Sequence, residues 1–383
     1  MNEKQKSAIL CILAVILGML AGYMAYDMKF GGAQDKYARE LPIRKNPIYC
    51  DVGIIRDNGT RFEILSDGRY GVLTMNFFAL IFDTWFGAAE ETPHPQDLLE
   101  MRYHDGTVFK GMIDTENCGI KAGGLRMAIG TGTGTPQYDD FNLFRNYTMT
   151  KPDTFRKVNN THYNITILGF FTPVDDINIT EVGLFMSYSG KYVLLVHDVL
   201  SPHIEVSANE TIGIFYCIYF TQPFTRQFCE TLYKYLFSGI TDDSFSLRAT
   251  DGYSTNGFDF YRDRYDDNRI HERLRISFGG WFNQYTMPTY AYASYTDSDD
   301  LEVLKYSYNS THFTFIMDTI VVVSSSTTIY ELGVDLLTDS RPEDWSYEAR
   351  WFILLYFKNE TGIHLQAGRG YKFRLTLVFT WEI

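Results

Sequence analysis

The sequence predicts an all-β protein in which two related domains follow a single N-terminal membrane helix. Three observations carry this prediction: aromatic residues make up 16% of the 383-residue chain, four blocks of sequence recur in the same order, and one long apolar run lies near the start. Aromatic residues favour strands. The net charge of −13 would repel a phosphate backbone, so no nucleic-acid partner is expected.

The apolar run is residues 7–26, SAILCILAVILGMLAGYMAY, which follow a short tail at 1–6. Its uncharged length matches the hydrocarbon core of a bilayer at about 1.5 Å of helix rise per residue, so we predict a transmembrane helix. A cleaved signal peptide is the alternative, because Lys4 and Lys6 precede the run, although it lacks an Ala-x-Ala cleavage site. A polar stalk is expected at 27–47.

Glycosylation motifs indicate which side of the membrane the rest of the chain occupies. The flanking lysines and arginines do not settle the orientation. Asn-x-Thr, the acceptor motif for N-linked sugars, occurs at Asn58, Asn146, Asn159, Asn164, Asn178, Asn209, Asn309 and Asn359. The alternative is that Asn and Thr are simply common in β-proteins and their turns. The motifs place the residues after the helix outside the cell or on a particle surface.

The cysteines are compatible with an oxidising compartment. Cys11 lies in the predicted membrane helix, which leaves Cys50, Cys118, Cys217 and Cys229 as candidates for two disulfides. The sequence does not decide among the three possible connectivities. Because there is no CxxC pair, a structural zinc site is not expected, and we predict no bound metal.

Four pairs of similar blocks indicate an internal duplication. Their offsets are 151, 149, 150 and 159 residues for Leu73–Gly87 with Phe224–Gly239, Leu125–Gly132 with Leu274–Trp281, Ile179–Met186 with Ile329–Leu336, and Ser207–Phe220 with Gln366–Phe379. Each block alone would be weak, but their common order and spacing are not. We therefore predict two copies of one unit, at 48–222 and 223–383.

Each copy is predicted to open with a short amphipathic helix and to continue as strands. The helix prediction rests on apolar residues at helical spacing, as at Phe77, Leu80 and Ile81. Strands are expected at 163–171, 191–199, 312–323, 350–357 and 373–381. The strand near 214–220 should point Ile214, Tyr216, Ile218 and Phe220 inward and Cys217 away. Without long helices between the strands, antiparallel sandwiches or jelly rolls are favoured.

The glycine-rich segment LRMAIGTGTGTPQYDDF, residues 125–141, raises the possibility of a phosphate site. No Lys follows Gly134 as a P-loop requires, and the even spacing of Gly130, Gly132 and Gly134 does not fit the dinucleotide pattern. The second copy keeps the first glycine, as Gly279, but lacks the alternating glycines that follow it in the first copy. We therefore interpret the glycines as serving backbone geometry at a crossover between strands.

Other candidate sites are weaker than their structural alternatives. The acidic stretches 264–269 and 297–300 read as solvated turns more readily than as calcium loops. A glycosidase carboxylate pair is left open, because such pairs meet only in the fold. The histidines, at His162, His197, His203 and His312 among others, match no catalytic motif. We predict no catalytic residue and no cofactor.

An aromatic stretch in the second copy is the best candidate for a contact surface. The residues in question are Trp281, Tyr285, Tyr290 and Tyr292. Aromatic faces offer large apolar area for stacking on a sugar or a partner protein. Ordinary strand and loop aromatics are the alternative.

The blocks at Thr74–Gly87, at IGTGTGTPQYDDFNL and at ITEVGLF, with the final alternating strand, together resemble β-structured modules of phage tails and appendages. The resemblance implies a strand-to-loop crossover at the glycines, followed by Asp139 or Asp140 and by Leu143, with no catalytic role. The membrane helix and the glycosylation motifs are unusual for that group. The tandem layout is similar to turret and vertex proteins of membrane-containing archaeal viruses.

Taken together, these features predict a non-enzymatic, glycosylated surface protein of a virion, such as a turret, a spike base or a capsid-associated component. It would be anchored in the virion or cell membrane by one helix, with the C-terminal domains outside. Expected partners are the membrane, further copies of the chain, other coat proteins and a host glycan or receptor. A cell-surface adhesin, carbohydrate-binding or filament subunit of an archaeon is the alternative, and a membrane-tethered glycosidase is a third.

Overall fold

The computed structural model describes residues 48–56, 61–66, 71–83, 99–110, 124–158, 163–221, 223–238, 247–248, 254–255, 274–278, 297–298, 302–308, 312–322, 327–340, 348–365 and 373–382. The predicted membrane helix and stalk lie outside these residues. Within the described ranges no helix is long and apolar enough to cross a membrane.

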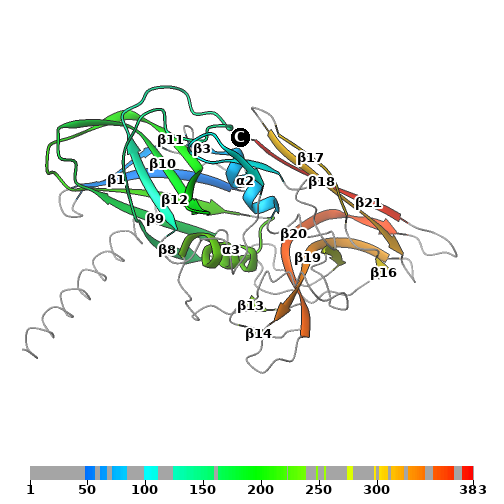
Figure 1. The fold of residues 1–383 in the computed structure, drawn as a ribbon. Coiled ribbons are helices and arrows are strands. Elements are labelled where there is room, and N and C mark those ends of the chain that lie inside the picture. Colours follow the sequence, from blue (N-terminus) through cyan, green and yellow to red (C-terminus); the bar gives the residue numbers. More distant parts are fainter. Residues whose placement is uncertain are drawn as a thin grey trace, which may run out of the picture. The chain divides into compact units, whose positions relative to one another are not determined.

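The N-terminal half of the described chain consists of strands and one short helix (Figure 1). The elements are β1 (Ile48–Arg56), β2 (Arg61–Ser66), β3 (Gly71–Leu73), α2 (Met75–Ile81), β4 (Glu100–Arg102), β5 (Val108–Lys110), β6 (Leu125–Gly130), β7 (Asn146–Thr150), β8 (Asp153–Val158), β9 (Tyr163–Phe171), β10 (Ile177–Tyr188), β11 (Lys191–Val206) and β12 (Ile212–Phe220). Mostly β structure with antiparallel pairing is therefore confirmed.

Two five-stranded antiparallel sheets organise this half. Sheet A has the order β2-β1-β12-β9-β8, and sheet B has the order β3-β11-β10-β6-β7. Strands β4 and β5 form a separate hairpin. The chain therefore makes a sandwich-like arrangement in which the consecutive strands β6 and β7, β8 and β9, and β10 and β11 pair within one sheet.

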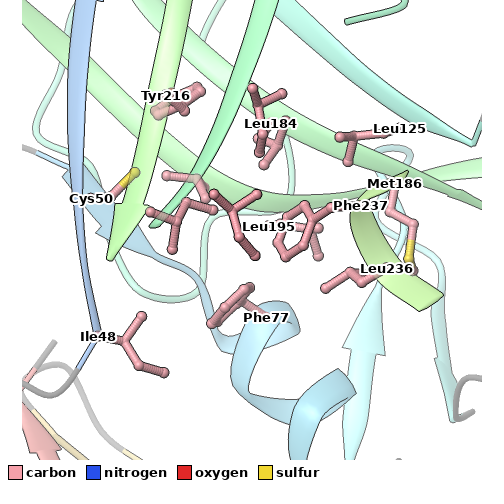
Figure 2. Close-up of a cluster of buried hydrophobic side chains, with 14 of the residues drawn as sticks. Ile48, Cys50, Phe77, Leu125, Leu184, Met186, Leu195, Tyr216, Leu236 and Phe237 are labelled. Atoms are coloured by element: carbon pink, nitrogen blue, oxygen red, sulfur yellow. The ribbon is translucent and has the colours of Figure 1, made fainter. Parts of the chain in front are cut away.

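One apolar core joins the two sheets (Figure 2). From β12 of sheet A it receives Ile214, Tyr216, Ile218 and Phe220, as the alternation predicts, and from β10 of sheet B it receives residues such as Leu184. Each fully buried side chain of this kind contributes roughly 1.5–3 kcal/mol to folding. The burial pattern thus fixes which face of each strand points inward.

Helix α2 is too short to be stable on its own, and tertiary contacts stabilise it. A helix is confirmed over this range, but all seven of its residues are buried, so the predicted amphipathic character, with one exposed polar face, is wrong. The preceding Thr74 donates its hydroxyl to the carbonyl of Leu194 at 2.7 Å, and the Asn76 amide donates to the same carbonyl at 3.1 Å. These bonds attach the helix to β11.

The C-terminal half contains a second short helix and a second set of strands. Its elements are α3 (Arg226–Leu232), the π-helical turn η4 (Tyr233–Ser238), β13 (Leu247–Arg248), β14 (Ser254–Thr255), β15 (Leu274–Phe278), β16 (Asp297–Ser298), β17 (Glu302–Tyr308), β18 (His312–Val322), β19 (Thr327–Ser340), β20 (Glu348–Leu365) and β21 (Phe373–Glu382). Strand β19 pairs with β15 and β20, and β18 pairs with β16, β17 and β21, all antiparallel.

Four of the strands predicted one by one are present close to their expected limits. They are β9, β11, β18 and β20, and the final alternating stretch forms β21. Because β-branched and aromatic residues dominate these stretches, local preference and tertiary pairing agree there. The longest errors are at β20, which continues to Leu365 beyond the predicted end at residue 357, and at β11, which continues to Val206 beyond the predicted end at residue 199.

Candidate functional site

The glycine-rich segment forms a loop that leaves β6 at Gly130 and enters β7 at Asn146. We call residues 131–145 the crossover loop. Its two ends are adjacent, because the amide of Thr131 donates to the carbonyl of Arg145 at 2.9 Å. Because β6 and β7 are neighbouring antiparallel strands of sheet B, the segment is a long hairpin connection, and the predicted crossover to another part of the sheet is wrong. The loop places its backbone beside β10 and β11.

A buried carboxylate holds both ends of the crossover loop. Glu181 on β10 is 0% exposed. Its Oε1 accepts hydrogen bonds from the amides of Gly132 at 2.8 Å and Arg145 at 2.7 Å, and its Oε2 accepts from the amide of Phe144 at 2.8 Å. Converging backbone amides are a common way to bind an anion. Here the anion is supplied by the chain itself.

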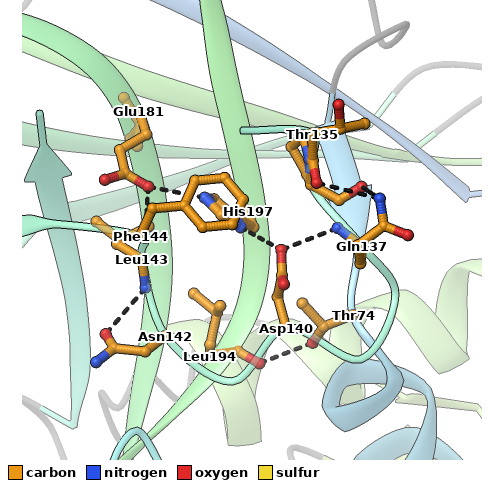
Figure 3. Close-up of polar contacts among 12 residues, drawn as sticks. Thr74, Thr135, Gln137, Asp140, Asn142, Leu143, Phe144, Glu181, Leu194 and His197 are labelled. Carbon is orange, nitrogen blue, oxygen red and sulfur yellow. Dashed lines mark hydrogen bonds and ion pairs between the residues drawn. The ribbon is translucent and has the colours of Figure 1, made fainter. Parts of the chain in front are cut away.

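His197 on β11 lies between this carboxylate and a second one (Figure 3). The ring is 0% exposed, with Nε2 at 3.0 Å from Oε2 of Glu181 and Nδ1 at 2.6 Å from Oδ2 of Asp140. Carboxylate oxygens only accept, so two short contacts of this kind require both ring nitrogens to carry a proton. The three residues, which we call the His197 cluster, therefore contain a buried imidazolium.

The electrostatics of the His197 cluster follow from its partners. Burial alone would lower the pKa of His197, but the hydrogen bonds and charges of Asp140 and Glu181 raise it to about 9. Burial would raise the pKa of Glu181, but its bonds from His197 and from three backbone amides hold it below the ordinary range. The cluster is thus charged near neutral pH.

Asp140 is fixed by the loop that carries it. Its Oδ2 accepts from the amide of Gln137 at 2.9 Å, and its own amide donates to the carbonyl of Gln137 at 3.1 Å. The ring of Phe144 lies over His197, with 4.8 Å between ring centroids. The loop therefore supplies one carboxylate and an aromatic cover, while the sheet supplies the imidazole and the other carboxylate.

The glycine spacing has a steric explanation. A Cβ atom built on Gly130 or on Gly132 would lie 2.5 Å from Oε1 of Glu181, and one on Gly134 would lie 2.6 Å from the Phe144 ring. Such contacts are far inside van der Waals distance. The interpretation of these glycines as backbone geometry is confirmed, and the requirement is close approach of Glu181 and Phe144.

A second buried acid is the neighbour of His197 but faces the sandwich core. Asp198 is 0% exposed, and within the described residues neither of its carboxylate oxygens has a hydrogen-bond partner. Burial raises the pKa of this carboxyl to about 7, against a smaller lowering by Tyr216 and by the charge of His197. The Tyr216 hydroxyl itself donates to the carbonyl of Val182 at 2.9 Å.

The structure places some of the predicted surface residues. Asn146, Asn178 and Asn209 are exposed, whereas Asn164 is 2% exposed and accepts from the Thr166 hydroxyl at 3.0 Å. A glycan on Asn164 has no room in this fold, because the side chain is enclosed. The backbone of Asn359 lies in β20, and Asn58, Asn159 and Asn309 fall outside the described residues.

Three of the four candidate disulfide cysteines lie in the part of the chain that the structure describes. Within the described residues no disulfide joins Cys50, Cys217 and Cys229. Two disulfides from four cysteines would need at least one bond among these three, since Cys118 lies outside the described residues. The reason is geometric: Cys50 packs in the core between the sheets, while Cys217 faces away from it with Sγ 3.5 Å from the Thr166 hydroxyl.

The predicted contact surface is not part of the described chain. The contact-surface residues Trp281, Tyr285, Tyr290 and Tyr292 lie outside the described residues. In the part of the chain that the structure describes, no three His, Cys, Asp or Glu side chains are arranged to hold a metal ion.

Sequence reasoning overlooked the His197 cluster. His197 matches no catalytic motif, and nothing in its local sequence marks it. Glu181 belongs to a block that recurs in the second copy, and Asp140 lies near the end of the glycine-rich segment. Both positions were therefore noticed in the sequence, but nothing there indicated which residue each of them contacts. Three strands or loops far apart in the chain had to meet before the site existed.

Comparison with known proteins identifies no relative. No known protein family, no curated protein and no solved structure matches this chain. The function must therefore be inferred from the residues and their geometry.

Proposed function

We propose that this chain is a glycosylated structural protein of a virion surface, anchored by its N-terminal helix and projecting two related β-sandwich modules. The observation that carries the proposal is the closed His197 cluster. Asp140 is its only partly exposed member, at 16%. The carboxylate oxygens of Glu181 bind backbone amides of the crossover loop, which leaves them unavailable to a substrate. An arrangement of this kind makes a sandwich rigid, which suits assembly and display more than turnover.

The strand registers support the predicted duplication. In the first copy Leu125 pairs with Met186, and in the second Leu274 pairs with Leu336, which are the same positions at the sequence offsets. The pairing of β10 with β11 shifts register at Ile179/Glu181 and Leu184/Phe185, and that of β19 with β20 shifts at Ile329/Glu331 and Val334/Asp335. Bulges at equivalent positions are unexpected for unrelated strands.

The helices fit the same correspondence. Leu73 pairs with Val196 just before α2, and Phe224 forms a bridge with Leu355 just before α3. Thr74 and Thr225 stand at the N-caps of the two helices, and Thr225 accepts a hydrogen bond from the amide of Phe228. We infer that each copy attaches its helix to the same strand of the same sheet.

The two copies have diverged at the His197 cluster. Gly183 pairs with His197, and the equivalent Gly333 pairs with Tyr356. Glu331 takes the position of Glu181, so the second copy keeps the acid and replaces the base. We infer that only the first module is braced by a charged cluster, which leaves the second free to have acquired a different surface role.

An adhesin or carbohydrate-binding subunit is the second candidate. Phe144 is 43% exposed at the end of the crossover loop, and Tyr147 is 37% exposed on β7, the terminal strand of sheet B. Exposed aromatic rings can stack on sugars. The two candidates share a surface location and differ in what the first module contacts.

Purified particles and host envelope fractions from one culture provide the test. Quantitative mass spectrometry should find the chain enriched in particles, with sugar on the exposed Asn-x-Thr sites. Protease added to intact particles should remove the β modules and leave the N-terminal segment protected. Recovery only in the host envelope, together with glycan binding lost in a Phe144→Ala variant, would instead support the adhesin.

A further inference from the structure

Three backbone amides bind the ends of the crossover loop to Glu181, but the contact that holds its middle, through Asp140, depends on a single buried proton. His197 touches Oδ2 of Asp140 through Nδ1 and Oε2 of Glu181 through Nε2. A neutral imidazole has one N–H and can donate to only one of them. Loss of the proton would leave the other carboxylate facing a bare nitrogen of a fully buried ring.

An unpaired charge of this kind is costly in a buried site, and the loop offers the easiest way to relieve it. Asp140 is partly exposed and sits on the loop, whereas Glu181 and His197 are fixed in adjacent strands. We propose that the crossover loop is a pH-sensitive latch, which is closed over sheet B while His197 is protonated and is released when that proton is lost.

The charged groups around His197 all favour the protonated form of its ring. Glu181 faces it from β10 and Asp140 from the loop, while Asp198, next to it on β11, points to the opposite face of the sheet. Gly130 of β6 lies opposite Glu181 and brings no charge. All three acids favour the protonated ring, so the latch stays closed at neutral pH.

The pH window follows from the sign of the shift. The pKa of His197 is raised from 6.5 to about 9, so the stabilisation is complete below about 6.5 and is lost as the pH rises through 9. Release would withdraw Leu143 of the loop from a small apolar cluster and uncover its partners on sheet B, which are Ala128, Phe185 and Leu194. The alkaline form of the module should therefore expose new apolar surface.

Pulsed millisecond hydrogen exchange on the full-length protein tests the latch. The reporters are the amides of Asp140 in the loop and of Met75, which donates to the loop carbonyl of Tyr138 at 2.6 Å. Their rates are corrected for the intrinsic effect of pH, and a β12 peptide is the internal reference. Above pH 9 the protection of the reporters should fall about tenfold per pH unit, while β12 stays protected. Unchanged reporter protection up to pH 10, or simultaneous loss at β12, would overturn the proposal.

Variants identify the responsible group. His197→Gln should give low, pH-independent protection of the loop, and His203→Gln, which alters an exposed histidine of the same strand, should keep the step. Asp140→Asn removes one acidic partner at the partly exposed side, so its step should move to lower pH even if His197→Gln does not fold. A step at the wild-type pH in either His197→Gln or Asp140→Asn would show that another group controls the loop.

Discussion

Replacing Asp198 by asparagine should stabilise the first module at neutral pH and have much less effect in acid. The wild-type carboxyl is fully buried, and its pKa is about 7 in place of the ordinary 3.8. For an acid whose folded pKa is raised, the folded state is favoured while the proton is bound. Stability is therefore lost as the pH rises from about 4 to 7 and is level above 7.

The size of the effect follows from the shift. Roughly three pKa units at about 1.36 kcal/mol per unit give a loss of about 4 kcal/mol at pH 8 that asparagine does not suffer. The buried amide of asparagine has its own cost, but that cost is the same at every pH. The diagnostic quantity is thus the change in the variant's relative stability between pH 4 and pH 8.

Urea unfolding of the full-length protein, followed by fluorescence at pH 4, 6 and 8, measures this quantity. The gain of Asp198→Asn over wild type should grow by up to about 4 kcal/mol across the series, or roughly 8–16 °C in Tm for a domain of this size. Asp175→Asn, at an exposed turn, is the matched control and should show no such trend. A difference that does not vary with pH would refute the reasoning.

Three further predictions concern the loop and the sugars. Gly132→Ala should destabilise the protein by about 1–3 kcal/mol, and Gly134→Ala by less, because the first meets a fixed carboxylate and the second a movable ring; chemical unfolding of both variants checks this. Glu181→Gln should cost about 3–5 kcal/mol at pH 6, where the imidazolium loses a buried partner, and equal unfolding midpoints for variant and wild type would contradict it. Asn146→Gln should remove one glycan from the intact mass and Asn164→Gln none, since only the first is exposed.

Sequence patterns predicted the strands better than the site. Alternation of apolar residues located the inward face of β12, and repeated blocks anticipated pairs of strands that have the same register in both halves. Alternation is read within one strand, and the repeated blocks are recognised by comparing one part of the sequence with another. The His197 cluster joins a loop and two strands through single residues, and no periodicity reports such a meeting.

The cysteine count says little about pairing for a related reason. Cys50 and Cys217 lie on paired strands, where Cys50 is opposite Ile218 and Cys217 is opposite Asp51. Side chains alternate along a strand, so neighbours offset by one position point to opposite faces of the sheet. An even number of cysteines carries no information about which face each one occupies, and in β-structure a shift of one residue decides it.

A double-mutant cycle between Glu181 and His197 tests most directly whether this cluster braces the first module. Wild type, Glu181→Gln, His197→Gln and the double variant would be unfolded in urea at pH 6, where both groups are charged. We predict a coupling free energy of about 2–3 kcal/mol, which is in the range of residues that share one buried network. Additive effects, with a coupling below about 0.5 kcal/mol, would contradict the role of the cluster as the brace of a structural module.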